Sequence, residues 1–147
     1  MFSKEESQKL RKEFWTSYGK SFPRKWLLYN TKIKGFSFKF VADKKEALVC
    51  LDIESFDRTK NELLFNQVLE LKSNLTEDYL PDVIFDELYP LDTGKIIHRI
   101  YVKYKGEFNI HNKNTWQGAY EFFNEAMHQF EEFYEDFEDF IKQAIYN

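Results

Sequence analysis

Asp52, Glu54 and Arg99 come closest in this sequence to a catalytic arrangement. Asp52 and Glu54 are separated by one residue in an extended stretch, so both side chains point to the same side. Asp86, Arg99 and Lys103 fall in later alternating stretches that could lie across a sheet from them. Carboxylates that converge with a cation are components of acid–base catalysis. A cross-strand ladder of opposite charges explains the same pattern, and we favour it.

The sequence contains parts of a metal-dependent nuclease motif, but not in the order that the motif requires. Pro81-Asp82 precede a predicted strand, as the first half of such a motif would. The nearest Glu-x-Lys triplet, Glu70-Leu71-Lys72, comes earlier in the chain and in a predicted helix. Asp43-Lys44-Lys45 has the right residue types, but in a predicted turn. Because the carboxylates and the lysine must converge on one ion, this order predicts no nuclease active site.

The other reactive residue types are isolated from one another. His98, His111 and His128 lack the spacing of a zinc site, and we expect each to be partnered or exposed. Cys50 lies in the apolar run Ala47–Leu51, which predicts a buried thiol rather than a nucleophile. Phosphate-binding glycine loops and serine nucleophile motifs do not occur. The sequence therefore predicts no catalytic residue, no metal site and no cofactor.

The N-terminal third combines cations with aromatic rings. Residues 1–45 contain twelve Lys or Arg and four Asp or Glu, whereas residues 46–147 contain nine and twenty-one. Cations contact phosphates and rings stack on bases, so this composition suits single-stranded nucleic acid or a groove partner. The alternative, which we favour, is that the basic third faces the acidic C-terminal helix, within one chain or across a dimer. The candidate binding residues are Arg24, Lys25, Trp26, Tyr29, Lys32, Lys34 and Lys39.

Helical and strand periodicities alternate along the chain. Ser3 and Glu6 form a capping box for the first helix, which Gly19 would end. After Gly35 the period changes to two, which predicts a strand hairpin. Asp57 can cap a second helix. In order, the expected elements are a helix over 4–18, a strand from residue 36, a strand over 47–53, a helix over 58–74, strands over 83–89 and 95–105, and a helix from 114 or 115 to 144.

The final helix carries much of the aromatic content, which is 19% for the whole chain. Large apolar residues recur at alternating spacings of four and three from Trp116 to Ile141, a heptad-like seam, and the opposite face is acidic. We expect a core built mainly from rings. The alternative is that some rings dock a partner, and a second copy of the chain, forming a homodimer, is one candidate partner.

The order of elements predicts the fold class and the number of domains. Neither a repeat nor a flexible linker interrupts the chain, so we expect a single domain over 1–147. The order α-β-β-α-β-β-α predicts an α+β two-layer fold, with helices over one face of a mainly antiparallel sheet. Apolar runs stay well short of the roughly 20 residues of a membrane span. A charged N-terminus without a secretory signal and a single cysteine predict a cytoplasmic location.

Several short motifs stand out along the chain: Phe14-Trp15, Gly35-Phe36-Ser37-Phe38, Lys60-Asn61, Phe65 and Trp116. Together they resemble a family of small bacterial domains of unknown function. In that family the domain occurs alone or behind predicted restriction-type nuclease domains. The resemblance extends over nearly the whole chain and implies an accessory role near nucleic-acid-processing systems, with no catalytic residues.

Three functional hypotheses follow from the sequence. The first is a non-enzymatic accessory or protein-interaction domain, which binds a protein partner or a second copy of itself. The second is a nucleic-acid-binding module, with phosphate contacts from Arg24, Lys25, Lys32 and Lys34 and base stacking on Trp26. A third, an enzyme with an unfamiliar site, depends on Asp52, Glu54 and Arg99 lying together in a cleft.

Overall fold

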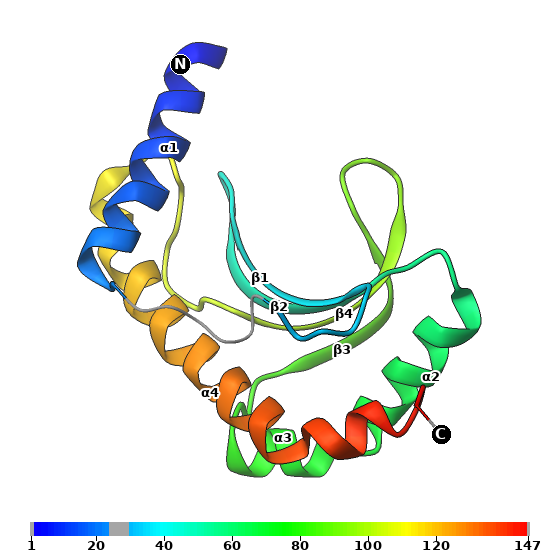
Figure 1. Cartoon of the computed structure of the whole chain (residues 1–147). Coiled ribbons are helices and arrows are strands. Elements are labelled where there is room, and N and C mark those ends of the chain that lie inside the picture. Colours follow the sequence, from blue (N-terminus) through cyan, green and yellow to red (C-terminus); the bar gives the residue numbers. More distant parts are fainter. Residues whose placement is uncertain (1, 24–29, 147) are drawn as a thin grey trace.

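The computed structural model describes residues 2–23 and 30–146, in which helices cover one face of a four-stranded sheet. The opposite, concave face of the sheet carries no helix of the described chain (Figure 1). Every neighbouring strand pair is antiparallel, in the order β1-β2-β4-β3. The predicted α+β class is therefore confirmed. The elements are α1 (Lys4–Ser21), β1 (Phe36–Ala42), β2 (Ala47–Ile53), α2 (Arg58–Leu69), α3 (Lys72–Asp78), β3 (Ile84–Pro90), β4 (Ile96–Lys103), a 3-10 turn η2 (Lys113–Thr115) and α4 (Trp116–Lys142).

Strand β2 lies inside the sheet, as its apolar run predicts, and all seven of its residues are buried. It pairs with β1 as a hairpin, from Phe36 opposite Ile53 to Ala42 opposite Ala47. The Asp43 carboxylate accepts hydrogen bonds from the backbone N–H groups of Lys45 and Glu46 and so fixes the tight turn.

A glycine locks the open end of this hairpin. Gly35 has a φ of +80°, and a Cβ built there would lie 2.5 Å from the carbonyl oxygen of Glu54. The Gly35 carbonyl in turn accepts a hydrogen bond of 2.7 Å from the Glu54 N–H. Only glycine permits both this backbone conformation and this approach. The start of β1 is therefore fixed against the end of β2.

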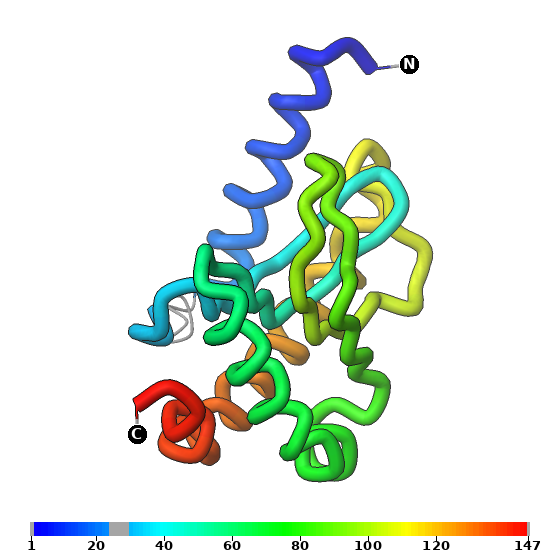
Figure 2. Tube along the Cα trace, turned by 90° about the vertical axis from the view of Figure 1, so that its right-hand side faces the viewer, coloured from blue at the N-terminus to red at the C-terminus, as the bar shows by residue number. Residues whose placement is uncertain are grey.

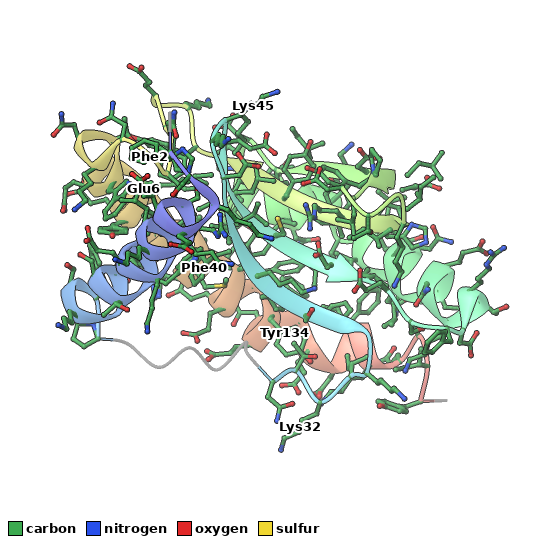
Figure 3. The ribbon with its side chains drawn as sticks, turned by 90° about the horizontal axis from the view of Figure 1, so that it is seen from above. Phe2, Glu6, Lys32, Phe40, Lys45 and Tyr134 are labelled. Atoms are coloured by element: carbon green, nitrogen blue, oxygen red, sulfur yellow. The ribbon has the colours of Figure 1, made fainter. Side chains whose placement is uncertain are left out.

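The aromatic residues build the core, as expected. Phe14 of α1 contacts Trp116, Tyr120 and Phe123 of α4, with ring centroids 4.9 to 6.2 Å apart. Buried polar ends of these rings find partners, since the Tyr120 hydroxyl donates to the Phe14 carbonyl at 2.7 Å. Figure 3 shows Phe40 of β1 on the side of the sheet next to α1.

The seam of α4 packs against the sheet and α1 of its own chain. Trp116, Tyr120, Phe123, Phe130 and Ile141 are all buried, and Phe137 is partly buried. From the sequence, this seam was a candidate docking face for a second copy of the chain. The structure corrects that prediction, because the seam already forms the core of its own chain. The dimer itself stays a prediction, and it would have to use another surface.

Two helix boundaries differ from the sequence prediction. Helix α1 passes through Gly19 and ends at Ser21, where the Phe22 N–H still bonds to Tyr18. Gly19 is exposed with open space around it, so nothing forces it into the left-handed conformation of a helix end. The predicted helix 58–74 is two helices, because Leu71 leaves helical geometry and its N–H bonds three residues back, to Val68. The break leaves Leu71 and Leu75 both buried.

Helix α1 extends past the sheet at its N-terminal end (Figure 1, Figure 2). Phe2 there contacts His111, with ring centroids 4.6 Å apart. Ser3 and Glu6 form the predicted capping box. None of the described helices is long and apolar enough to cross a membrane.

Candidate functional site

The uncovered face of the sheet holds a buried ion pair between Asp52 and Arg99. The two residues are opposite each other in β2 and β4, and Asp86 of β3 is the next residue in the same row. Arg99 Nε and Nη2 donate to the two carboxylate oxygens of Asp52 at 2.7 and 2.9 Å. Asp52 is 1% exposed and Arg99 5%. The Asp52–Arg99 part of the predicted cross-strand charge ladder is therefore confirmed, in a strong bidentate form, whereas Lys103 pairs with Glu46 instead.

Neighbouring side chains complete this cluster. The Arg99 guanidinium lies 4.4 Å from the ring centroid of Tyr89. Lys39 Nζ lies 3.7 Å from Asp52 and 3.9 Å from Glu54. Burial by itself lowers the pKa of Arg99, but the hydrogen bonds to Asp52 and nearby negative charge outweigh it, so the pKa is raised. Arg99 therefore stays charged and hydrogen-bonded to Asp52.

Cys50 lies two residues before Asp52 in β2, opposite Lys39 of β1 and Tyr101 of β4, and is fully buried. Burial raises its pKa far above the ordinary value, an effect that the charge of Arg99 offsets only in part. A thiol nucleophile must ionise, so this one is inert at neutral pH. The predicted buried thiol is confirmed.

The histidines and the incomplete nuclease motif remain dispersed. His98 stacks on Phe65, His111 lies 3.1 Å from the Ser7 hydroxyl, and His128 lies 3.0 Å from Glu132. Within residues 2–23 and 30–146, no group of three His, Cys, Asp or Glu side chains could hold a metal ion. Asp82 instead pairs with Lys105 at 2.9 Å. Glu70 and Lys72 sit at the α2–α3 junction, and Asp43 serves the hairpin turn.

The basic residues of the N-terminal third are placed on different surfaces. Arg24, Lys25, Trp26 and Tyr29 lie outside the described residues. Lys32 and Lys34 are exposed in the loop before β1, whereas Lys39 is turned toward the carboxylates of the sheet. Figure 3 shows Lys32 and the hairpin residue Lys45 at opposite ends of the molecule.

A basic hollow on α1 was not among the predicted sites. It has a volume of about 480 Å³ and is lined by Lys9, Lys12 and Lys20 together with Glu13, Thr16 and Ser17. These residues recur at helical spacing on the exposed side of α1, so a helical plot of the N-terminal segment could have found the hollow.

A larger groove, of about 730 Å³, runs beside α4. Its walls are the α3–β3 connection, the end of β4 and the first half of α4. The apolar lining comprises Leu80, Val102, Tyr104, Phe122 and Ala126, and the charged lining comprises Asp78, Asp82, Lys103, Lys105, Glu121 and Glu125.

Sequence reasoning missed this groove because three separate segments form it. Only α4 carries a sequence pattern that could have pointed to the groove. Glu121 and Glu125 are one turn apart there, and Gly118 interrupts an otherwise strong helix sequence. Nothing in the sequence places that turn beside Tyr104 of the β4 end.

Comparison with known proteins identifies a family without an assigned activity. A family model described as a domain of unknown function (DUF4268) matches residues 10–138. This range contains the ion pair on the sheet and every residue that lines the groove. No curated protein and no solved structure matches the chain.

Proposed function

The chain belongs to the DUF4268 family of domains of unknown function, and from this premise we propose that it is an accessory protein-interaction domain that binds its partner in the groove beside α4. The observation that carries the proposal is the make-up of the groove. Half-buried rings and exposed charged side chains line it. Interface cores in other proteins share this combination of aromatic floor and polar rim.

The sheet face supports a binding domain rather than an enzyme. A general acid or base must exchange a proton with a substrate, and the Asp52 carboxylate is instead buried against Arg99. The Cys50 thiol, the other candidate reactive group nearby, is held in its neutral form by burial. This face therefore serves stability in our proposal, and the groove serves recognition.

The accessory part of the proposal concerns the partner's biology. The resemblance carried by the short motifs described above implies a bacterial setting near nucleic-acid-processing systems of the restriction type, and the single cysteine and charged N-terminus favour the cytoplasm. We propose that the partner is a protein of such a system.

Site-specific photo-crosslinking in the producing cells tests the proposed function. A photoreactive residue at Gln129, which lines the groove, should give one discrete protein adduct, and so should one at Glu125. The matched control position is Glu62, which is exposed on α2 outside the groove. The adduct should disappear when Glu121→Lys is added. Equal adducts from Glu62 and the groove, or no adduct from the groove, would refute the proposal.

A second candidate function, nucleic-acid binding, is favoured by the distribution of exposed cations. Lys9, Lys12 and Lys20 line the hollow of α1 with two hydroxyl side chains. Lys34 precedes Gly35, which lies close to the Glu54 carbonyl and the Ser55 side chain, and the next residue, Phe56, has a fully exposed ring. Exposed cations suit phosphate contact, and an exposed ring suits base stacking.

Fluorescence anisotropy of labelled single- and double-stranded DNA and RNA tests this candidate. Binding should weaken steeply between about 50 and 200 mM salt, since several phosphates would be contacted. Reversing Arg24 and Lys25 to Glu should weaken binding and flatten its salt dependence, whereas reversing Lys44 and Lys45 at the hairpin tip should change it less. Equal effects from the two pairs, or no binding at the lower salt, would eliminate this function.

A further inference from the structure

We infer that the groove beside α4 recognises a short basic peptide segment of the partner, with one large apolar side chain inserted between flanking lysine or arginine residues. This inference rests on the proposed function and specifies the chemistry of its partner. Four features of the groove lead to it. They are, among the described residues, unpaired carboxylates, partly exposed aromatic rings at its base, two glycines that make room for one of these rings, and the unpaired edge of a strand.

The two lysines of the groove are already paired. Lys105 Nζ lies 2.9 Å from Asp82 across the rim. Lys103 Nζ lies 3.7 Å from Glu46, which is outside the groove. Neither lysine is paired with one of the remaining carboxylates.

Three other carboxylates of the lining are exposed and form no ion pair within the described part of the chain. Like charges on one rim attract cations and repel polyanions, so the groove favours a basic segment and disfavours nucleic acid. Two of the three are one helical turn apart and present their charges to the same side. They are Asp78, Glu121 and Glu125.

The floor of the groove offers a place for an apolar side chain. The rings of Tyr104 and Phe122 are 5.5 Å apart between centroids, and both are only partly buried. Leu80 and Ala126 are buried beside them. Each ring thus exposes apolar area that an inserted side chain would remove from water.

Two glycines fix the position of Tyr104. A Cβ at Gly118 would lie 2.0 Å from the Tyr104 hydroxyl oxygen, and one at Gly106 would lie 2.4 Å from the same atom. Gly118 is the third residue of α4, and glycine is a weaker helix former than alanine. Its missing side chain leaves the space that the Tyr104 hydroxyl occupies, so a larger residue there would displace the ring.

The end of β4 gives the groove an open strand edge. Pairing between β3 and β4 begins with Ile84 opposite Tyr101. Among the described pairs, Val102 and Lys103 are paired with β2 alone. Backbone groups alternate in direction along a strand, and the Tyr104 N–H bonds to Ala47 on the β2 side, so the Lys103 backbone faces the open side. An extended peptide can add backbone hydrogen bonding at Lys103 while its side chains reach the rim and the floor.

Anisotropy titration of the full chain with three labelled synthetic peptides tests the inference. The first peptide alternates Lys with Leu, the second replaces each Leu by Ser, and the third replaces each Lys by Glu. The Lys/Leu peptide should bind at least about tenfold more tightly than either of the others, because only it supplies both charge and apolar area.

Variants of the protein locate the binding. Glu121→Gln with Glu125→Gln should weaken the Lys/Leu peptide by about tenfold, whereas the matched pair Glu135→Gln with Asp139→Asn, exposed on α4 outside the groove, should leave it unchanged. Gly118→Ala should also weaken binding, because it displaces the Tyr104 ring, and circular dichroism checks that the helix remains.

The outcomes separate the two proposals. Equal weakening by both charge pairs would mean unspecific attraction and would overturn the inference, as would preference for the acidic or the serine peptide. If no peptide binds while groove crosslinks form in cells, the partner chemistry is wrong and the interaction function stands. If the Lys/Leu peptide binds in the groove but no crosslink forms, the inferred chemistry holds and the cellular role fails.

Discussion

The open sheet face and the groove beside α4 both carry charged side chains, but in the described part of the chain the charges are buried and paired on the sheet and exposed and unpaired on the α4 side of the groove. On the sheet, Asp52 is held by two hydrogen bonds from Arg99 and approached by Lys39. In the groove, Glu121 and Glu125 are exposed, and neither forms an ion pair with another described residue, since Lys103 and Lys105 pair with Glu46 and Asp82. A charge that is buried and paired contributes to a unique structure, whereas an exposed and unpaired one remains available to a partner. Burial and pairing therefore decide which charges we assign to folding and which to recognition.

Breaking the buried pair should give the largest effect. Replacing Asp52 by Ala leaves Arg99 charged and unpaired inside the sheet, and the free energy of unfolding should fall by about 3–5 kcal/mol. Urea denaturation measures this loss. Asp52→Leu combined with Arg99→Met should recover most of it, because no buried charge remains. A loss below about 1 kcal/mol for Asp52→Ala would remove the distinction between the two surfaces.

The thiol beside the pair should make stability depend on alkaline pH. Because the pKa of Cys50 is raised in the folded state, its contribution is complete below the pKa of the unfolded thiol and is lost as the pH rises above it. Stability should therefore fall by up to about 1.4 kcal/mol per pH unit above roughly pH 8.5. The measurement is urea denaturation from neutral to alkaline pH. The Cys50→Ala variant is the control, and an identical slope in both proteins would contradict the assignment.

The ring over Arg99 should have a smaller effect. Tyr89→Leu keeps apolar volume but removes the cation–π contact at 4.4 Å, and we expect a loss of about 1 kcal/mol in thermal or urea unfolding. Tyr101→Leu is a matched control, since Tyr101 contacts Tyr89 edge-on with ring centroids 5.5 Å apart. A larger loss at Tyr101 than at Tyr89 would show that ring–ring packing, and not the cation, stabilises this face.

Removing the groove charges should have the smallest effect on stability. Glu121→Gln with Glu125→Gln should change the free energy of unfolding by less than about 0.5 kcal/mol, and the change should be stabilising because like charges one turn apart repel. Differential scanning calorimetry at low and high salt checks both the size and the sign. A loss comparable to that of Asp52→Ala would mean that the groove acids are structural after all.

The sequence predicted the sheet face better than it predicted the groove. Alternation in the stretches around Asp52 and Arg99 fixes which side chains share a face, so the ladder could be expected before the strand order was known. Strand limits also fell within a few residues of the structure. The break at Leu71 was missed because both halves keep the same apolar period. The groove was missed because its Tyr104 and Glu121 sides meet only through the tertiary fold.

The place of Asp52 and Arg99 in the chain has a consequence for how the protein folds. They are 47 residues apart, and their ladder joins the two hairpins β1–β2 and β3–β4. Hairpins close short loops, whereas the central ladder closes a long one and bears a larger loss of chain entropy. We therefore expect the hairpins to form first and the central ladder to close last. A substitution of Asp52 would then speed unfolding far more than it slows refolding.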